Sequence, residues 1–244
     1  MLRSKSKVQN YYHQNKNLEK QFSLLVWNIH KENQKHNFER FFLELLEQYK
    51  SDLLLLQEVQ YPKQKTFFLK DYSYTLAGNI ETKKNLFGVM TAAKSSFKSV
   101  LSAHSLNKEF GCITHKSFLI SQHPFMNNTK LTLVNLHAIN FVSNKVFEKE
   151  LLHIQNTLLE CDTPLIIAGD FNNWNKKRFT LLKKFQQELS LQKLEPQNSH
   201  HIKKIFSHTI DHIYYRKLKP LQALAIDTKK ISDHNPIYAV FELL

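Results

Sequence analysis

The sequence predicts an α/β fold, and two features of its pattern carry that prediction. Apolar runs of strand length alternate with amphipathic segments of helix length in residues 23–59 and again in residues 131–168. Elsewhere the apolar runs are short and follow one another without an intervening helix, which is typical of antiparallel sheet. Together the two patterns predict mixed β-sheet with helices packed against it.

The first strand–helix–strand unit begins with Ser23–Ile29, an apolar run bounded by polar residues, which predicts a buried strand. In residues 37–49 the apolar side chains recur at helical spacing behind a potential Asn37 cap, so we expect a surface helix. Asp52–Val59 then returns as a strand, and its run of leucines predicts burial on both faces.

The middle of the chain, residues 72–120, carries the shorter runs SYTLAGN, LFGVMTAA and ITHKSFLIS, which predict hairpins. Leu131–Ala138 is expected to be a strand, residues 146–158 a helix, and Pro164–Ala168 the strand that follows it. The remaining expected elements are a helix near residues 178–194 and strands at Thr209–Tyr215 and Pro236–Leu243.

Length and composition predict a single globular domain. The chain has 244 residues, of which 42% are hydrophobic, and single domains commonly reach this size. Residues 1–22 are basic and polar and lack the apolar run of a signal peptide, so we expect a basic N-terminal extension before one domain of residues 23–244. No apolar run approaches the ~20 residues that span a bilayer. We therefore expect a soluble, cytoplasmic protein, and a monomer.

The net charge of +13 favours polyanionic partners such as nucleic acid or anionic lipid headgroups. The alternative is that the charge serves solubility alone. With only four glycines the chain has no glycine-rich phosphate loop, which argues against nucleotide-cofactor chemistry. Two cysteines are too few for a disulfide framework or a cysteine-rich zinc site.

Polar side chains suited to metal or proton chemistry stand where the predicted strands end. Side chains at strand ends of α/β proteins converge at one edge of the sheet, so we expect these residues to line one pocket. The six clusters are Asn28, Glu58, Asn135 with His137, Asp170 with Asn172, Asp211 with His212, and Asp233 with His234.

The motifs WNIH, LLLLQEV, LVNLHAINF, LIIAGDFN, TIDHIYY and ISDHNPI occur in this order between Trp27 and Ile237. Their order and spacing resemble the endonuclease/exonuclease/phosphatase superfamily, which includes deoxyribonuclease I, abasic-site endonucleases, sphingomyelinases and inositol-phosphate 5-phosphatases. The HAINF stretch is most similar to the bacterial YafD branch. The resemblance implies a deoxyribonuclease I-like four-layer α/β sandwich, with two packed mixed β-sheets flanked by helices. It also implies a Mg²⁺-dependent phosphoric ester hydrolase in which Mn²⁺ can substitute.

For the metal, the resemblance implies Glu58 as the main carboxylate ligand, with Asn28 and Asp233 supporting it directly or through water. A hard oxygen ligand suits Mg²⁺. The amide of Asn28 is also able to order Glu58. Outside the motif context, Glu58 is compatible with a solvated strand end and Asn28 with a turn.

For catalysis, Asp170 and Asn172 resemble the pair that holds the attacking water and a phosphate oxygen; the alternative is a simple Gly-Asp turn. His234 with Asp211 resembles the buried histidine and its orienting carboxylate, acting as a base or as an electrostatic clamp. His137 resembles a second histidine that contacts the phosphate or protonates the leaving oxygen, the alternative being a core histidine.

Other polar residues carry weaker signals. His212 follows Asp211 on a strand, so it should point to the opposite face and be structural. The pair His200 and His201 is weak evidence for a metal. Lys116 is a candidate phosphate contact, with an ordinary surface lysine as the alternative.

The function predicted is a metal-dependent nuclease that hydrolyses DNA or RNA by in-line attack of an activated water. Charge favours it, as do Tyr61, Phe67 and Phe68, which lie among lysines and would flank a backbone groove. The alternative is a phospholipid or inositol-phosphate phosphodiesterase or phosphatase, because a basic surface also attracts anionic membranes. The substrate motifs of abasic-site endonucleases and 5-phosphatases are absent. A binding protein without turnover is the third hypothesis.

Overall fold

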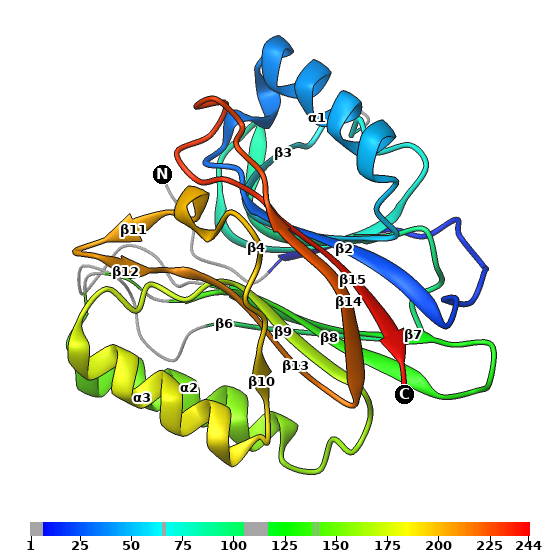
Figure 1. The fold of residues 1–244 in the computed structure, drawn as a ribbon. Coiled ribbons are helices and arrows are strands. Elements are labelled where there is room, and N and C mark those ends of the chain that lie inside the picture. The colour runs from blue at the N-terminus through cyan, green and yellow to red at the C-terminus, as the bar shows by residue number, and fades with distance from the viewer. Residues whose placement is uncertain (1–6, 65–66, 105–116, 139, 141) are drawn as a thin grey trace.

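The computed structural model describes residues 7–64, 67–104, 117–138, 140 and 142–244 (Figure 1). Two β-sheets pack face to face at the centre of the molecule. Helix α1 covers the outer face of one sheet, and α2 and α3 lie together over the outer face of the other (Figure 1). This arrangement confirms the predicted four-layer α/β sandwich.

Within the described residues the first sheet has seven strands in the order β1-β4-β5-β3-β2-β15-β14. Strands β2 and β3 are parallel because α1 crosses between them, whereas the other neighbours are antiparallel. The elements are β1 (Lys7–Tyr11), β2 (Gln21–Asn28), the 3₁₀ turn η1 (Glu32–Gln34), α1 (His36–Tyr49), β3 (Leu53–Pro62), β4 (Ser73–Glu81), β5 (Asn85–Ala93), β14 (Leu218–Ala225) and β15 (Ile237–Leu243).

The second sheet has six strands in the described part of the chain, in the order β10-β13-β9-β8-β7-β6. Its one parallel pair, β8 with β9, is again joined by a crossover helix, α2. The elements are β6 (Ser99–His104), β7 (Ser117–Pro124), β8 (Lys130–His137), α2 (Asn144–Leu158), β9 (Leu165–Asp170), α3 (Lys176–Glu188), β10 (Gln192–Lys193) and β13 (Asp211–Arg216). A 3₁₀ turn, η2 (Ser199–His201), and a small hairpin, β11 (Lys204–Ile205) with β12 (His208–Thr209), precede β13.

Strand alternation divides the core into layers. In β9, Ile166 and Ala168 belong to the apolar cluster between the two sheets, whereas Leu165 and Ile167 belong to the cluster beneath α2 and α3. Asp170 therefore lies on the inner face, in line with Ile166 and Ala168. The same alternation places the last residue of several strands at one end of the seam between the sheets.

The segment predicted to be a basic N-terminal extension contains one strand of the first sheet. Residues Lys7–Tyr11 pair antiparallel with β4 as an edge strand, and β2 begins at Gln21. Strand β14 was also not predicted; it is an edge strand with a bulge at Pro220, where proline is tolerated. The exposed positions of both strands mix polar side chains with apolar ones such as Val8 and Leu221, so their hydrophobic pattern is weak. None of the helices in the described part of the chain has the length and apolar composition needed to cross a bilayer.

Helix boundaries also differ from those expected. Helix α1 begins at His36 behind Lys35, and Lys35 provides no side-chain cap, so Asn37 lies inside the helix. Helix α3 ends at Glu188, and the backbone then turns through Ser190, which has a φ of 52°. The apolar residues Leu191 and Leu194 extend the apparent helical period past this turn, but they lie on either side of β10.

Candidate active site

The second sheet places His137, Asp170 and Asp211 side by side. In the parallel pair β8–β9, His137 lies opposite Asp170, and in the antiparallel pair β9–β13, Asp211 lies opposite Asp170. Each residue is an even number of positions from an inner-core residue of its own strand, so all three side chains face the first sheet. Strand register thus forms a row of one imidazole and two carboxylates.

The first sheet contributes Asn28 and Glu58. Asn28 ends β2 on the inner face, two residues beyond Val26. Alternation alone would turn Glu58 outward, because its neighbour Gln57 faces inward and bonds to Asn135. A register shift after Leu56 and a left-handed φ of 55° at Glu58 turn its carboxylate back toward the seam.

The amide of Asn28 joins the two sheets. Its Nδ2 donates to Asp170 Oδ2 at 3.1 Å and lies 3.5 Å from Glu58 Oε1. Its Oδ1 accepts from the backbone N–H of His30 at 3.1 Å. His137 Nε2 lies 3.7 Å from both Glu58 Oε1 and Asp170 Oδ2. Asn28 therefore orients two carboxylates that would otherwise repel each other.

The turn after β9 holds Asn172 and Asp170 together. The backbone N–H of Asn172 donates to Asp170 Oδ1 at 3.0 Å, and its side-chain Nδ2 donates to the carbonyl of Ala138 at 3.1 Å. Gly169 adopts a φ of 138°, and a Cβ there would lie 2.0 Å from the carbonyl oxygen of Leu136. Only glycine fits this approach of β9 to β8, so the position of Asp170 depends on it.

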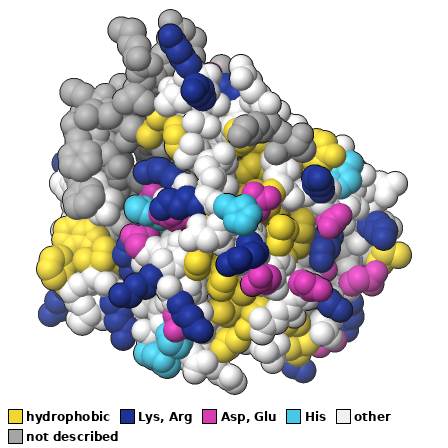
Figure 2. Space-filling view, turned by 90° about the horizontal axis from the view of Figure 1, so that it is seen from above, with side chains coloured by type: hydrophobic (Ala, Val, Ile, Leu, Met, Phe, Trp, Pro, Cys, Tyr) yellow, Lys and Arg dark blue, Asp and Glu magenta, His cyan; other side chains and the backbone are white. Residues whose placement is uncertain are grey.

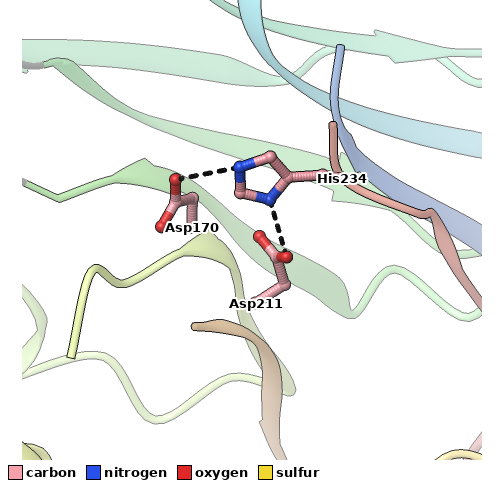
Figure 3. A group of neighbouring side chains, drawn as sticks. All are labelled: Asp170, Asp211 and His234. Carbon is pink, nitrogen blue, oxygen red and sulfur yellow. Dashed lines mark hydrogen bonds and ion pairs between the residues drawn. The ribbon is translucent and has the colours of Figure 1, made fainter. Parts of the chain in front are cut away.

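His234 lies between two carboxylates (Figure 3). Its Nδ1 is 2.8 Å from Asp211 Oδ2, and its Nε2 is 3.9 Å from Asp170 Oδ2. Burial alone would lower the pKa of this imidazole, but Asp211, and then Asp170, outweigh burial and raise the pKa to about 9. The side chain is therefore an imidazolium at neutral pH.

The loop that carries His234 is anchored to the end of β2. The indole Nε1 of Trp27 donates to the carbonyl of His234 at 2.8 Å. Ser232 Oγ donates to the carbonyl of Asn28 at 2.9 Å and accepts from the backbone N–H of His234 at 3.3 Å. These bonds explain why the WN and SDHN motifs occur together: each fixes the backbone of the other.

Asp233 lies at the rim of the site. Its side chain is 44% exposed, pairs with Lys203, and has Oδ1 3.9 Å from His234 Nε2. Burial would raise the pKa of this carboxyl, but Lys203 and His234 lower it overall, so Asp233 is ionised. An open groove of about 500 Å³ runs beside it and is lined in part by His30, Lys35 and Lys230. Seen from above, acidic, basic and histidine side chains lie together on the left of the molecule (Figure 2).

The donor set fits a hard divalent cation. Glu58, Asp170 and Asp233 are carboxylates with oxygen donors, which Mg²⁺ prefers. Lys31 Nζ lies 3.4 Å from Glu58 Oε2, and Lys203 pairs with Asp233, so cations already neutralise two of these carboxylates. Donor atoms of Asp170, Asp211 and His234 also lie within 4.8 Å of one another. A protonated imidazole is a poor ligand, however, which favours the carboxylates nearer Glu58.

The imidazolium of His234 makes stability depend on pH, which gives a first prediction. Its pKa of about 9 in the folded chain exceeds the ordinary value of 6.5, so its stabilising contribution is complete below pH 6.5 and is lost as pH rises through 9. With metal removed by EDTA, the free energy of unfolding should fall over that window by on the order of 3 kcal/mol. Urea unfolding from pH 6 to pH 9.5 measures it, and Asp211→Asn should flatten the slope. Equal slopes in both proteins would refute the assignment.

Sequence reasoning missed Arg178, which is fully buried. Its Nη1 donates to the carbonyl of Asn172 at 2.8 Å and its Nη2 to the carbonyl of Val142 at 2.9 Å, so it joins the turn after β9 to the loop before α2. A signal was available: Arg178 lies on the apolar stripe of α3 with Leu182 and Phe185. A charged residue on a buried stripe indicates a specific partner.

Some predicted candidates lie away from the centre. Asn135 is buried between the sheets and its amide donates to the carbonyls of Leu56 and Met90. His212 faces the helices as expected, bonds to Asn173, and has a pKa lowered to about 3, first by burial. His200 and His201 lie against each other in η2. Lys116 lies outside the described residues.

The aromatic residues expected to flank a nucleic-acid groove do not do so. Phe67 is buried, and Tyr61 and Phe68 pack against the same cluster beneath α1. The rings of Tyr61 and Phe67 stack at 5.6 Å, and Phe68 lies edge-on to Phe42. The expectation was wrong because neighbouring lysines in sequence say nothing about which way a ring points.

Comparison with known proteins places this geometry in a family. The model of the Endonuclease/Exonuclease/phosphatase family matches residues 25–234. A UPF0294 protein of Erwinia tasmaniensis is 31% identical over 226 residues, covering 90% of this chain and 81% of the relative, in agreement with the predicted YafD-like branch.

Solved structures agree in fold. An endonuclease/exonuclease/phosphatase family protein from Leptotrichia buccalis superimposes with a TM-score of 0.69 at 15% identity, over 91% of this chain and all of that one. D. rerio TDP2, complexed with single strand DNA product, gives 0.66 at 18% identity, over 91% of this chain and 99% of its own. The chain therefore belongs to the endonuclease/exonuclease/phosphatase family, whose members generally hydrolyse phosphoester bonds.

Proposed function

We propose that this chain is a Mg²⁺-dependent phosphodiesterase that hydrolyses nucleic acid. The observation that carries the proposal is that side chains from both sheets meet at Asp170: Asn28 of the first sheet donates to it, and the imidazolium of His234, held by Asp211, lies beside it. Phosphodiester hydrolysis needs an oriented water, neutralisation of the non-bridging oxygens and assistance to the leaving oxygen. This centre has a group for each need.

Glu58 is the residue proposed to hold Mg²⁺, with Asp233 and Asn28 supporting it directly or through water. The cation supplies charge neutralisation at the phosphate when it is bound. Lys31 would be displaced from Glu58 on binding, since its exposed ammonium lies 3.4 Å from the carboxylate and competes for the same charge. The left-handed backbone of Glu58 supports this role, because strain of that kind persists where function requires it.

Asp170 and Asn172 are proposed to orient the attacking water, with Asp170 accepting its proton. His234 enters the reaction already protonated, which favours a role as an electrostatic clamp on the phosphate over a role as general base. Asp211 holds the imidazolium so that its Nε2 can donate to a phosphate oxygen as negative charge develops there. His137, 3.7 Å from both Glu58 and Asp170, is positioned to contact the phosphate or the leaving oxygen.

A nucleic-acid substrate is supported by the charge of +13 and by lysines around the groove beside Asp233. D. rerio TDP2, which shares the fold, was solved with a single strand DNA product. Phosphoinositides remain the comparison substrate, because the same groups serve both chemistries.

The test compares the purified protein with Glu58→Gln on plasmid DNA, single-stranded DNA, RNA and a phosphoinositide panel, with Mg²⁺ or EDTA. We expect cleavage of nucleic acid that needs Mg²⁺ and falls at least roughly 10²-fold in the variant. Mg²⁺ should also raise the melting temperature of the wild type and not of Glu58→Gln.

Asp162→Asn is the matched control, since Asp162 is an exposed carboxylate before β9, at the other end of that strand from Asp170. It should retain full activity. Cleavage of nucleic acid that is undiminished in Glu58→Gln would come from a contaminating nuclease. Selective turnover of phosphoinositides would replace nucleic acid as the proposed substrate. The absence of turnover on every substrate would refute an enzymatic function.

A further inference from the structure

The hairpin β11–β12 ends in an unusual turn. Its two central residues, Phe206 and Ser207, have φ values of 48° and 71°. Two-residue turns with both φ values positive favour Asn-Gly or Asp-Gly, and a bulky side chain in this conformation is strained. The ring gains no burial in return, because Phe206 is 79% exposed. Folding does not account for a phenylalanine at this position.

The hairpin projects from the rim of the active site. Lys203, immediately before β11, pairs with Asp233, and Asp211, which begins the strand after β12, holds His234. The two ends of the hairpin are thus fixed to the two sides of the same centre. Its tip lies at the left of the molecule in Figure 1.

A second aromatic ring, that of Trp174 in the turn after β9, lies against the tip of the hairpin. Trp174, two residues after Asn172, lies edge-on to Phe206 with ring centroids 6.3 Å apart. Its Nε1 donates to Asn140 Oδ1 at 2.8 Å, and its ring lies 5.0 Å from the guanidinium of Arg178. Trp174 is therefore held in place, whereas Phe206 is free of packing on most of its surface.

Further rings and cations continue this surface. Phe179 is 49% exposed and stacks with His208 at 6.0 Å. We call Trp174, Phe179, Phe206 and His208 the aromatic rim. Three exposed lysines are close to these residues in sequence: Lys176 and Lys177 begin α3, between Trp174 and Phe179, and Lys204 begins β11, two residues before Phe206. Figure 2 shows a hydrophobic group at the left edge of the molecule with Lys or Arg side chains beside it, on the side where the hairpin ends in Figure 1.

We propose that the aromatic rim stacks against a base of a single-stranded nucleic acid whose phosphate enters the active site. The inference rests on the proposed function and adds how the substrate is recognised. Aromatic faces beside lysines match the two properties of such a strand, flat bases and a phosphate backbone, and this recognition tolerates any sequence. Rings near the catalytic centre select a strand whose bases are unpaired, because bases in a duplex are already stacked.

The test is the affinity of a fluorescein-labelled single-stranded oligonucleotide, measured by fluorescence anisotropy in EDTA so that no cleavage occurs. Phe206→Asn suits the left-handed turn, so the melting temperature should stay equal or rise while Kd rises about 10-fold, within the range expected for loss of one stacking contact. Phe206→Tyr keeps the ring and should keep the affinity. Leu159→Asn, at an exposed apolar residue after α2, is the control and should change nothing.

A strand of the same length and charge that lacks bases identifies stacking directly. On it, wild type and Phe206→Asn should bind equally weakly. An unchanged Kd of Phe206→Asn for the normal strand overturns the inference, whatever the activity assays give. The inference is also overturned if Phe206→Asn loses binding to anionic phospholipid vesicles but keeps its affinity for the oligonucleotide, since the aromatic rim would then be a membrane contact. If the wild type shows no turnover but Phe206→Asn still binds more weakly than the wild type only to the strand that has bases, the proposed hydrolysis is refuted and the inferred stacking is retained.

Discussion

Asp170→Asn should lower kcat/KM by roughly 10³-fold while leaving the fold intact. The substitution keeps the shape of the side chain, and its remaining oxygen can still accept from Asn28 or from the backbone N–H of Asn172. It removes the negative charge that would accept a proton from water. It also removes one of the two carboxylates that raise the pKa of His234.

Initial-rate kinetics on a single-stranded oligonucleotide, with circular dichroism and urea unfolding of the same preparations, measure this effect. The loss should lie in kcat, because the carboxylate acts on the water and not on binding. Asp162→Asn removes an exposed charge at the opposite end of β9 and should retain wild-type rates. Retention of more than a tenth of the wild-type rate by Asp170→Asn would exclude Asp170 as the acceptor of the proton.

His234→Asn should lower kcat by roughly 10³-fold, and Asp211→Asn by less, because Asp211 acts through the imidazole that it holds at 2.8 Å. The double variant should be no slower than His234→Asn alone, since the two residues act as one unit. In Asp211→Asn the pKa of His234 loses its largest raising influence. The activity of this variant should therefore disappear at a lower pH than that of the wild type.

The measurement is a double-mutant cycle of kcat, together with pH–rate profiles from pH 6 to pH 10. The wild-type profile should decline on the alkaline side near pH 9, as the imidazolium loses its proton. Additive losses in the double variant would mean that Asp211 acts independently of His234. A profile of Asp211→Asn that coincides with that of the wild type would separate the alkaline decline from His234.

Much of the candidate site was predictable because side chains alternate between the two faces of a strand, so the position of a residue at a strand end fixes the face on which it lies. Asn28 and Asp170 end apolar strands and Asp211 begins one, and the alternation along each strand fixes the face on which the polar side chain lies. His234 precedes a strand, so its place depended on resemblance to known motifs. The side-chain bonds of Trp27 and Ser232, which fix that loop, show why motifs distant in sequence are constrained together.

Glu58 shows the limit of that rule. Its position relative to Gln57 predicts the outer face, and only a bulge with a positive φ returns it to the site. No local pattern in LLLLQEV signals such a bulge. The positions of the aromatic residues were mispredicted for a related reason. Phe67 packs beneath α1, whereas the half-buried Trp174 and the exposed Phe206 lie on a turn and a hairpin that have no periodicity.

Because each sheet supplies only part of the centre, the candidate site is complete only after both sheets have formed. Asn28 and Glu58 lie on strands β2 and β3 near the start of the chain, whereas His234 lies three residues before β15, which pairs with β2. A nascent chain that still lacks residues 234–244 would contain the carboxylate of Glu58 but not the imidazolium of His234. Under the proposed nuclease function, a chain emerging from the ribosome would not cleave the surrounding RNA until its C-terminal strand β15 has paired with β2.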